Sequence, residues 1–588
     1  MSEIVQILKC ETQSADLMLT GLVLMRYLAQ RQVNQKRMAA TDCVSLVLQA
    51  LQIHDSNPTL QGVACDTLGN LLQEEINTEQ FLQQRGVDAV FRVINANMSH
   101  TRVMEAACFL LGNVASSEEG LKHIARNGGG KVALSVMKAH DKDPELLREL
   151  LFLTSNVAQS PQLQQELTDA GAVEAVLGVM QQHVASPELQ AMACSAIDNL
   201  CSAPSKGTEG NNNNTNAYRP SDSAVKTIIQ AVDRHCNDAS VVRRGAGALA
   251  TLASLKPALS SFIGKEETVQ CLVEAGSSVL KGKQDNQAVI QVFRALESLA
   301  DVKENKALLS REDGAVQLVM TLVNSSSPRP APVARALAFI AKLCENDDMK
   351  QHHPQIKEDL GLEMVSSSLS HFWNHPSVVI PACTIMAALA KDTQEEETMN
   401  GHRSSMGENV DLWKRAMGGL LKAVRARPGD VAVAVSACVA LAWLCERRVQ
   451  PSTSEVGDLM GAFVMVMRAH PRDADVAEAA CFMFSSVAKE NSPAIRQQVI
   501  KSGAPLLVVM VLRHFSEAPG EVQPVLRRAV NAIRLVGLDD QATAGAVRLA
   551  RAPEALKKII SRFPENASLS KSASTALNSI EQSASSGL

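Results

Sequence analysis

Aromatic side chains are scarce in this chain: they make up 3% of its 588 residues, with only two tyrosines and three tryptophans. A core with so few rings must be built mainly from Leu, Val, Ala, Met and Cys, which suits closely spaced helices. An excess of basic charge is also missing, because 57 Lys and Arg face 62 Asp and Glu and leave a net charge of −5. Without a global basic field we expect no nucleic-acid partner.

Segments for secretion or membrane insertion are missing as well. The first residues, MSEIVQILKCETQ, carry acidic side chains where a signal peptide needs a basic stretch. The longest apolar run, residues 431–445, is shorter than the ~17–25 residues of a spanning helix, so we interpret it as a buried helix. The 13 cysteines form no C-x-x-C pair, which indicates free thiols in a reducing compartment. We expect a cytoplasmic protein without membrane insertion, and nuclear or cytoskeletal association stays open.

Catalytic signatures are missing too. The sequence has no phosphate-binding loop, no dinucleotide-binding G-x-G-x-x-G, no G-x-S-x-G and no H-E-x-x-H. His371 and His375 have the i, i+4 spacing of metal ligands, but no carboxylate follows at a fixed offset. We therefore interpret them as surface or packing histidines. The sequence predicts no enzyme, no cofactor and no metal site.

A 43-residue repeat organises the first part of the chain. The segments GVACDTLGNLL, EAACFLLGNVA, RELLFLTSNVA and AMACSAIDNLC begin at residues 62, 105, 148 and 191, and their asparagines are each 43 residues apart. We call the place of these asparagines the marker position. The same frame, with steps of 43–55 residues, gives thirteen units. Outside the four asparagines the markers are Tyr27, Thr251, Ser298, Lys342, Ala388, Trp443, Ser486, Leu535 and Ser579.

Neighbouring positions support this frame. The residue after the marker is Leu, Val or Ile in all thirteen units, and the residue two before it is apolar in twelve, Thr154 being the exception. Positions three apart share one face of a helix, so the frame predicts a recurring amphipathic helix. Nine cysteines fall five before or two after the marker, where small apolar residues recur, and we interpret them as buried thiols rather than metal ligands. A glycine about 16 residues after several markers opens a further apolar helix, so each unit should hold two or three helices.

These residues resemble the armadillo repeat. The period of 40-odd residues, the A-x-x-x-L-x-N-L-A helix and the Gly-Gly-Ala entry to the next helix look like that superfamily, most clearly in residues 105–140. The resemblance covers nearly all of residues 1–588 and implies an all-α, right-handed superhelical solenoid whose third helices line a concave groove. We expect residues 202–223 to be a disordered Asn-rich insertion, 391–411 a polar insertion and 582–588 a flexible tail.

The resemblance also implies a row of ligand contacts. In armadillo proteins that bind extended peptides, the motif asparagine faces the groove and hydrogen-bonds the ligand backbone. A side-chain amide offers both a donor and an acceptor, as an extended backbone requires. The alternative is that the asparagines only tie neighbouring turns of the solenoid together. We call these four residues the asparagine ladder: Asn70, Asn113, Asn156 and Asn199.

Two further groups are expected to face the groove. Phe109 and Phe152 lie four residues before their markers, where importin-alpha carries tryptophan, and offer either a short apolar platform or core packing. The middle of the array has a set of basic residues that could receive an acidic or phosphorylated partner segment, or could be solvated charges partly neutralised by Glu297. This basic set is Arg244, Arg294, Arg335 and Lys342.

We therefore predict a non-enzymatic interaction scaffold or adaptor that binds an extended segment of a protein partner along its groove. One alternative is a permanent structural subunit of a cytoskeletal or axonemal assembly. Another is a transport adaptor like importin-alpha, which is disfavoured because the sequence lacks a Trp–Asn array and a basic N-terminal arm. The sequence leaves the oligomeric state open.

Overall fold

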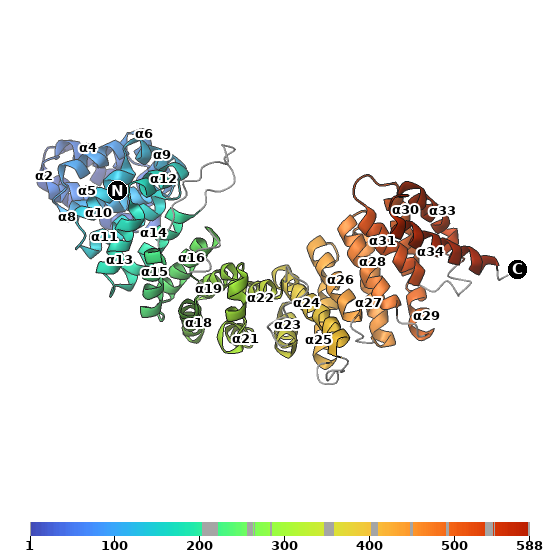
Figure 1. The fold of residues 1–588 in the computed structure, drawn as a ribbon. Coiled ribbons are helices and arrows are strands. Elements are labelled where there is room, and N and C mark those ends of the chain that lie inside the picture. Colours follow the sequence, from blue (N-terminus) through green and yellow to red (C-terminus); the bar gives the residue numbers. More distant parts are fainter. Residues whose placement is uncertain are drawn as a thin grey trace. The chain divides into compact units, whose positions relative to one another are not determined.

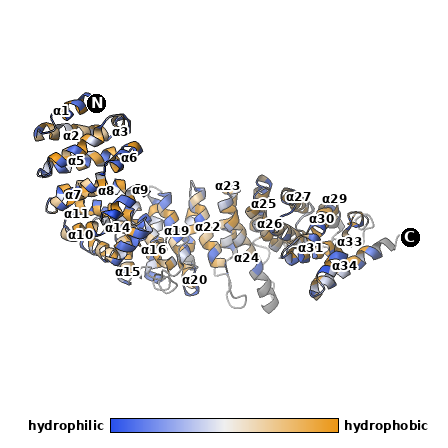
Figure 2. Ribbon diagram, turned by 90° about the horizontal axis from the view of Figure 1, so that it is seen from above, coloured by the Kyte–Doolittle hydropathy of each residue, from blue (hydrophilic) through white to orange (hydrophobic). Residues whose placement is uncertain are grey.

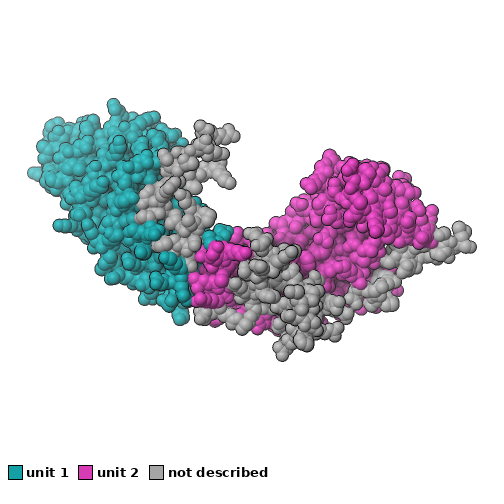
Figure 3. All heavy atoms as spheres, in the orientation of Figure 1, with its two compact units in different colours: residues 1–302 teal, residues 303–588 magenta. Residues whose placement is uncertain are grey.

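The computed structural model describes residues 2–585 apart from ten internal gaps. The gaps are residues 203–221, 256–262, 264, 283–284, 346–357, 401–409, 447–450, 490–492, 536–544 and 546. The described residues form α-helices and one short π-helical turn, and no strand. They divide into two compact units, residues 1–302 and 303–588, which are teal and magenta in Figure 3.

In the first unit, the marker position of every repeat lies on or at the end of one long helix, and these helices pack side by side in chain order. We call them the third helices. They are α2 (Ala15–Ala29), α5 (Pro58–Leu71), α8 (Thr101–Val114), α11 (Pro144–Val157), α14 (Pro187–Cys201), α16 (Ala239–Leu255) and α19 (Asn286–Leu299). Their successive contacts make one continuous row (Figure 1).

A second row covers one side of these helices. Each of its members precedes and packs against a third helix, as α4 does on α5 and α7 on α8. These second helices are α4 (Cys43–Ile53), α7 (Gly86–Ala96), α10 (Gly129–Ala139), α13 (Ala172–Gln182), α15 (Asp222–Arg234) and α18 (Glu266–Lys281). Shorter first helices connect the rows: α3 (Gln32–Ala39), α6 (Glu75–Gln83), α9 (Glu118–Arg126) and α12 (Pro161–Asp169), and α1 (Ser2–Cys10) lies before them.

The second unit repeats the arrangement. Its third helices are α22 (Pro330–Cys344), α24 (Pro376–Asn400), α26 (Val431–Glu446), α28 (Ala474–Ala488), α31 (Gln523–Leu535) and α34 (Ala567–Ser585). Its second helices are α21 (Gln317–Val323), α23 (Glu358–Phe372), α25 (Val410–Ala426), α27 (Thr453–Ala469), α30 (Ala504–Glu517) and α33 (Ala552–Arg562). Between some of them lie α20 (Lys303–Leu309), the π-helical η1 (Glu312–Val316) and α29 (Pro493–Lys501). The described residues thus include thirteen third helices, and the prediction of an all-α solenoid is confirmed.

Local sequence explains where the helices begin. Several third helices start with a capping side chain followed by proline, as at Asn57-Pro58, where the Asn57 side chain accepts a hydrogen bond from the Leu60 amide at 3.1 Å. Such a side chain satisfies a free helical amide, and proline at the first position loses no hydrogen bond. Second helices start after a sharp turn, for which Gly171 and Gly503 adopt φ of +81° and +74°. Glycine adopts this left-handed conformation without steric cost, so the predicted glycine boundaries are explained there.

The core is aliphatic, as the scarcity of rings predicts. Hydrophilic and hydrophobic residues both occur on each helix (Figure 2), and the hydrophobic ones pack between the rows. The six cysteines five residues before a marker are at most 1% exposed. Burial raises the pKa of these thiols, for Cys108 and Cys194 to about 12, because a thiolate loses its hydration there. No described helix combines the length and the apolar composition needed to cross a bilayer.

The expected insertions fall mostly outside the described residues. Residues 203–221, within the predicted 202–223 insertion, lie in a gap between α14 and α15. The predicted 391–411 insertion begins inside α24, which extends to Asn400, and residues 401–409 again lie outside the described residues. The predicted tail at 582–588 begins inside α34, which extends to Ser585.

Candidate functional site

The asparagine ladder lies along the third helices of the first unit. Each of the four side chains is half-buried, and each Nδ2 donates a hydrogen bond to a backbone carbonyl 44 residues earlier, in the preceding third helix. The accepting carbonyls lie in the last helical turn, where the intrahelical ladder leaves carbonyls without an amide. The bonds are Asn70 to Arg26 (3.3 Å), Asn113 to Gly69 (2.9 Å), Asn156 to Gly112 (2.9 Å) and Asn199 to Ser155 (2.7 Å).

These bonds use one of the two N–H groups of each amide, and Asn199 Nδ2 also donates to Ser155 Oγ at 2.9 Å. The donor of the asparagine ties two repeats together, while no described residue donates a hydrogen bond to its Oδ1. At Asn70, Asn113 and Asn156, both Oδ1 and the second N–H of Nδ2 therefore have no partner among the described residues. Ligand contact stays a prediction, and the tie between repeats, which the sequence left as the alternative, is present in the structure.

The rings of Phe109 and Phe152 lie on glycine backbone of the neighbouring helix. A Cβ added to Gly69 would come within 2.6 Å of the Phe109 ring, and one added to Gly112 within 2.5 Å of the Phe152 ring. Both phenylalanines remain half-buried. Each ring thus packs between two repeats and still presents part of its surface beside the asparagine ladder, so it has features of both predicted alternatives.

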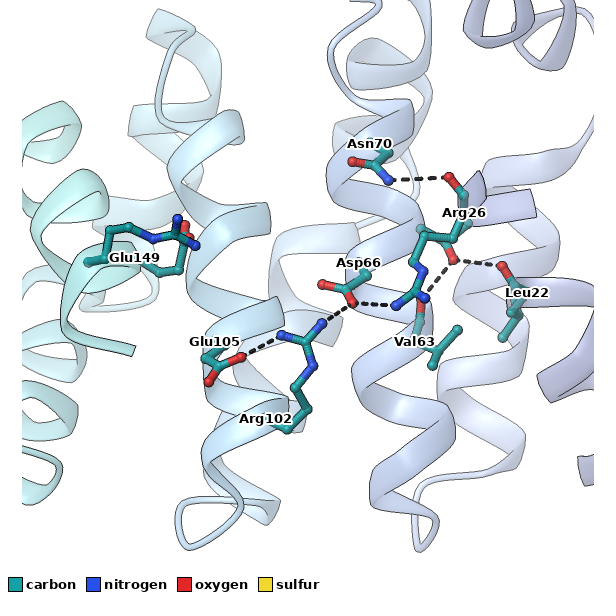
Figure 4. Close-up of polar contacts among 10 residues, drawn as sticks. Leu22, Arg26, Val63, Asp66, Asn70, Arg102, Glu105 and Glu149 are labelled. Carbon is teal, nitrogen blue, oxygen red and sulfur yellow. Dashed lines mark hydrogen bonds and ion pairs between the residues drawn. The ribbon is translucent and has the colours of Figure 1, made fainter. Parts of the chain in front are cut away.

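Charged side chains border the start of the ladder (Figure 4). Asp66 Oδ2 accepts from Arg26 at 3.1 Å and from Arg102 at 2.7 Å, and Arg102 also pairs with Glu105. In Figure 4, Asp66 lies between these arginines, and Asn70 lies one helical turn further along α5. The arginines of this region therefore have carboxylate partners.

Glu149 adds a carboxylate whose pKa is raised by burial to the same region. Its Oε1 accepts from Arg148 Nη2 at 2.8 Å. Burial nevertheless raises the pKa of Glu149, with Arg148 acting in the opposite direction and the negative charges of Glu105 and Asp66 adding to the rise. This face of the first unit thus has carboxylates from α5, α8 and α11 close enough to influence one another.

The predicted basic set is divided between the two units. Arg244 and Arg294 belong to the first unit, on α16 and α19, and Arg335 and Lys342 belong to the second, on α22. The structure describes each pair within its own unit. Lys342 Nζ lies 3.5 Å from a Glu345 carboxylate oxygen, which is an i, i+3 pair at the end of α22.

The two arginines of the first unit have different surroundings. Arg244 Nη1 lies 2.9 Å from the sulfur of Met192, and burial, followed by repulsion from Arg243, lowers the pKa of Arg244. Arg294 donates to Thr251 Oγ1 at 3.5 Å, and the Thr251 hydroxyl donates to Asp198 Oδ1 at 2.5 Å. Arg294 is therefore held in a polar network with a carboxylate.

A half-buried carboxylate, that of Asp198, lies at one end of this network. Burial raises the pKa of Asp198, whereas the Thr251 hydrogen bond and the charge of Arg294 act to lower it. Asp198 directly precedes Asn199, so the network that holds Arg294 lies next to the last asparagine of the ladder.

A histidine series was missed in the sequence although its signal is present there. Five histidines lie 16 residues before a marker, at the end of a second helix, and each Nε2 bonds a backbone carbonyl of the preceding repeat at 2.8–2.9 Å. They are His54, His140, His183, His235 and His470. The series ties the second helices together much as the asparagines tie the third helices.

The described part of the chain contains no cluster of side chains suited to bind a metal ion. No group of three or more His, Cys, Asp or Glu there could hold an ion. His371 Nδ1 instead lies 3.0 Å from the Ser367 carbonyl oxygen and 3.0 Å from the Ser370 hydroxyl. The asparagine ladder, the two phenylalanines and the charged residues of the first unit lie instead along the row of third helices.

Comparison with known proteins gives a fold and no family. No protein-family model and no curated protein sequence matches the chain. A solved structure from work on a conserved phosphorylation switch that controls the interaction between cadherin and beta-catenin is similar, with a TM-score of 0.52 over 91% of this chain and 100% of that chain. The two sequences are 14% identical, so the likeness shows a shared fold alone.

Proposed function

We propose that this chain is an armadillo-type scaffold that binds an extended segment of a protein partner along its third helices. The observation that carries the proposal is the asparagine ladder, whose four Oδ1 atoms recur at equal intervals of 43 residues without a donor from the described residues. An extended segment presents backbone N–H groups at regular intervals and can donate to such acceptors.

Several observations support this role. The fold is similar to a structure from work on the interaction between cadherin and beta-catenin, which is an interaction between two proteins. Phe109 and Phe152 add partly exposed ring surface beside the ladder, and the carboxylates of Asp66, Glu105 and Glu149 add charge. The role requires neither a catalytic group nor a cofactor. Thirteen free cysteines support a reducing, cytoplasmic setting for it.

The test separates ligand contact from the tie between repeats. Changing all four ladder asparagines to alanine removes both the donor and the acceptor, whereas changing them to aspartate removes the donor and keeps an acceptor at the same place. Both variants lose the inter-repeat hydrogen bonds. If Oδ1 contacts a ligand, the alanine variant should lose more partner binding than the aspartate variant.

The measurement is affinity purification with mass spectrometry, on proteins whose folding has been matched by circular dichroism and thermal melting. At about 1 kcal/mol for each hydrogen bond, the alanine variant should lose the groove partner by up to roughly a thousandfold if the losses add fully. The same partner set on the wild type and the alanine variant would contradict the proposal and leave the asparagines with a structural role.

A further inference from the structure

Three consecutive third helices of the second unit carry a stack of two rings and an arginine. The Trp443 ring of α26 meets the Phe482 ring of α28 edge-on, with centroids 5.5 Å apart. The guanidinium carbon of Arg528, from α31, lies 4.0 Å from the centroid of the Phe482 ring. Because α28 packs against both α26 and α31, the stack crosses three neighbouring helices (Figure 1).

Each member of this stack occupies a position of its own repeat at which the first unit also carries a candidate residue. Trp443 occupies a marker position, Phe482 lies four before one and Arg528 seven before one. These are the positions of Asn113, Phe109 and Arg244 in their own repeats. Trp443 and Arg528 are half-buried, and Phe482 is 8% exposed. The ring of Phe482 is therefore largely covered, and Trp443 and Arg528 form the accessible part.

α31 has an unbalanced charge. It contains Arg527, Arg528 and Arg534 and no acidic residue. Arg534 donates to the neighbouring Asn531 side chain at 3.0 Å, and none of the three arginines has a carboxylate partner among the described residues. Glu478, one turn before Phe482 on α28, forms no ion pair with Arg528.

This lack of partners distinguishes α31 from the start of the first unit. Arg26 and Arg102 pair with Asp66 there, and Arg148 contacts Glu145, Glu149 and Glu188. A half-buried guanidinium has five N–H donors, and leaving donors without acceptors costs free energy. The guanidinium carbon of Arg528 lies over the Phe482 ring, and its N–H groups have no hydrogen-bond acceptor among the described residues.

We propose that this surface binds a carboxylate side chain of an extended, acidic segment of a protein partner. The carboxylate is held by the N–H edge of Arg528, with Arg527 and Arg534 supplying further positive charge, and an apolar side chain of the same segment lies against Trp443. The inference rests on the proposed function in one respect, namely that the partner is an extended protein segment on the third-helix face.

The geometry suggests the spacing of the two side chains in the partner. In an extended chain, residues i and i+2 point the same way and lie ~7 Å apart. Trp443 and Arg528 both contact the Phe482 ring, with distances of 5.5 Å and 4.0 Å to its centroid, so two side chains of one face of an extended segment can reach both. The partner motif is therefore an apolar residue followed or preceded, two positions away, by Asp or Glu.

A synthetic peptide tests this on the full chain. The probe is a fluorescein-labelled peptide with three repeats of Leu-Ser-Glu-Ser, in which Leu and Glu share one face of the extended chain. One comparison peptide carries Gln in place of Glu, and a second carries phosphoserine there. Binding is measured by fluorescence anisotropy. We expect the Glu peptide to bind roughly tenfold or more tightly than the Gln peptide, as a charge-assisted bidentate hydrogen bond would give.

Variants locate the site. Arg528→Gln should weaken the Glu peptide by roughly tenfold to a hundredfold. Arg528→Lys should recover only part of the loss, because lysine keeps the charge and lacks the planar fork that stacks on Phe482. Arg468→Gln is the matched control: it removes an exposed arginine of α27, in the second-helix row, and should leave binding unchanged.

Several outcomes would overturn the inference. They are equal binding of the Glu and Gln peptides, equal effects of the Arg528 and Arg468 variants, and binding of the phosphoserine peptide alone, which would make phosphate the ligand. If Arg528→Gln fails to fold, the Arg528→Lys variant decides. The quadruple alanine variant of the asparagine ladder distinguishes the two proposals, because it should lose its partners even if Arg528 proves dispensable.

Discussion

The ring of Phe109 rests on the backbone of Gly69, forty residues earlier, so closely that a Cβ at Gly69 would lie 2.6 Å from it. The same relationship recurs one repeat later between Phe152 and Gly112. In each case the glycine directly precedes a ladder asparagine, and its carbonyl accepts the hydrogen bond from the next asparagine of the ladder. The phenylalanine ring and the asparagine amide of one repeat thus contact the same glycine of the preceding repeat.

Gly69→Ala should destabilise the first unit. The added methyl group forces the Phe109 ring to move, which we expect to cost about 1–3 kcal/mol, outweighing the gain of roughly 1 kcal/mol from alanine in a helix. The measurement is the midpoint of urea unfolding followed by circular dichroism.

Gly178→Ala in α13 is the matched control, because nothing lies within 4 Å of its added Cβ. It should stabilise the protein by about 0.5–1 kcal/mol through helix propensity alone. If the two changes shift the midpoint in the same direction, the Phe109–Gly69 contact does not hold the repeats together.

The fold could be predicted from the sequence because the same positions around the marker are apolar in nearly every repeat and form the buried face of a helix. Leu71 and Val114 follow their markers, and both are buried where the frame expects them. The sequence could not decide which hydrogen bonds the asparagine amides make. The acceptor of the Asn113 bond is the carbonyl of a residue 44 positions earlier, and that carbonyl lacks a helical amide partner only because α5 ends there. His183 illustrates the opposite case, because a histidine 16 residues before the marker recurs in five repeats and is visible in the sequence.

The basic set shows a second feature that the repeat frame could not predict, namely which residues share a surface. Arg244 and Arg335 occupy equivalent positions in the frame, which treats every repeat as a neighbour of the next. The structure assigns them to different units, so a frame shared along the chain does not establish a shared surface. The Phe482–Arg528 stack was likewise outside the predicted set, because it depends on how two helices meet rather than on one helix alone.

His183→Ala should loosen the contact between two repeats. The change removes the hydrogen bond between the ring and the Asp141 carbonyl at 2.9 Å, which we expect to cost about 1 kcal/mol. Since each repeat contacts mainly its neighbours, the effect should be local, and hydrogen exchange should accelerate at the end of α13. His100→Ala serves as the control, because this exposed residue caps α8 without a side-chain hydrogen bond. Equal exchange in both variants would show that the histidine series adds nothing to the solenoid.

Glu149→Gln should stabilise the protein at neutral pH. Burial raises the pKa of Glu149 in the folded state, so the folded protein binds the proton more tightly than the unfolded chain does. The ionised carboxylate therefore costs stability above the folded pKa, and that cost disappears as the pH falls below the unfolded pKa. Glutamine keeps an oxygen to accept from Arg148 and carries no charge.

The measurement is the difference in melting temperature between Glu149→Gln and the wild type at several pH values. It should be largest near pH 7 and shrink as the pH falls through the pKa of Glu149. Glu188→Gln is the control, since that carboxylate has the same arginine partner but is exposed, and surface pairs contribute little. A difference that grows on acidification would contradict the assignment of burial as the dominant cause.

Cysteine reactivity should differ sharply between Cys10 and the fully buried thiols of the third helices. Cys10 on α1 is exposed, whereas Cys108 and Cys194 are buried and their pKa is raised to about 12. A thiol reagent at pH 8 attacks the thiolate, so Cys10 should react fast and the buried thiols only when their repeats open. Cys10→Ser should remove the fast phase that Cys10 contributes, and urea should release the remaining thiols. If Cys108 or Cys194 reacts as fast as Cys10 in the native protein, the third helices open far more often than their packing allows.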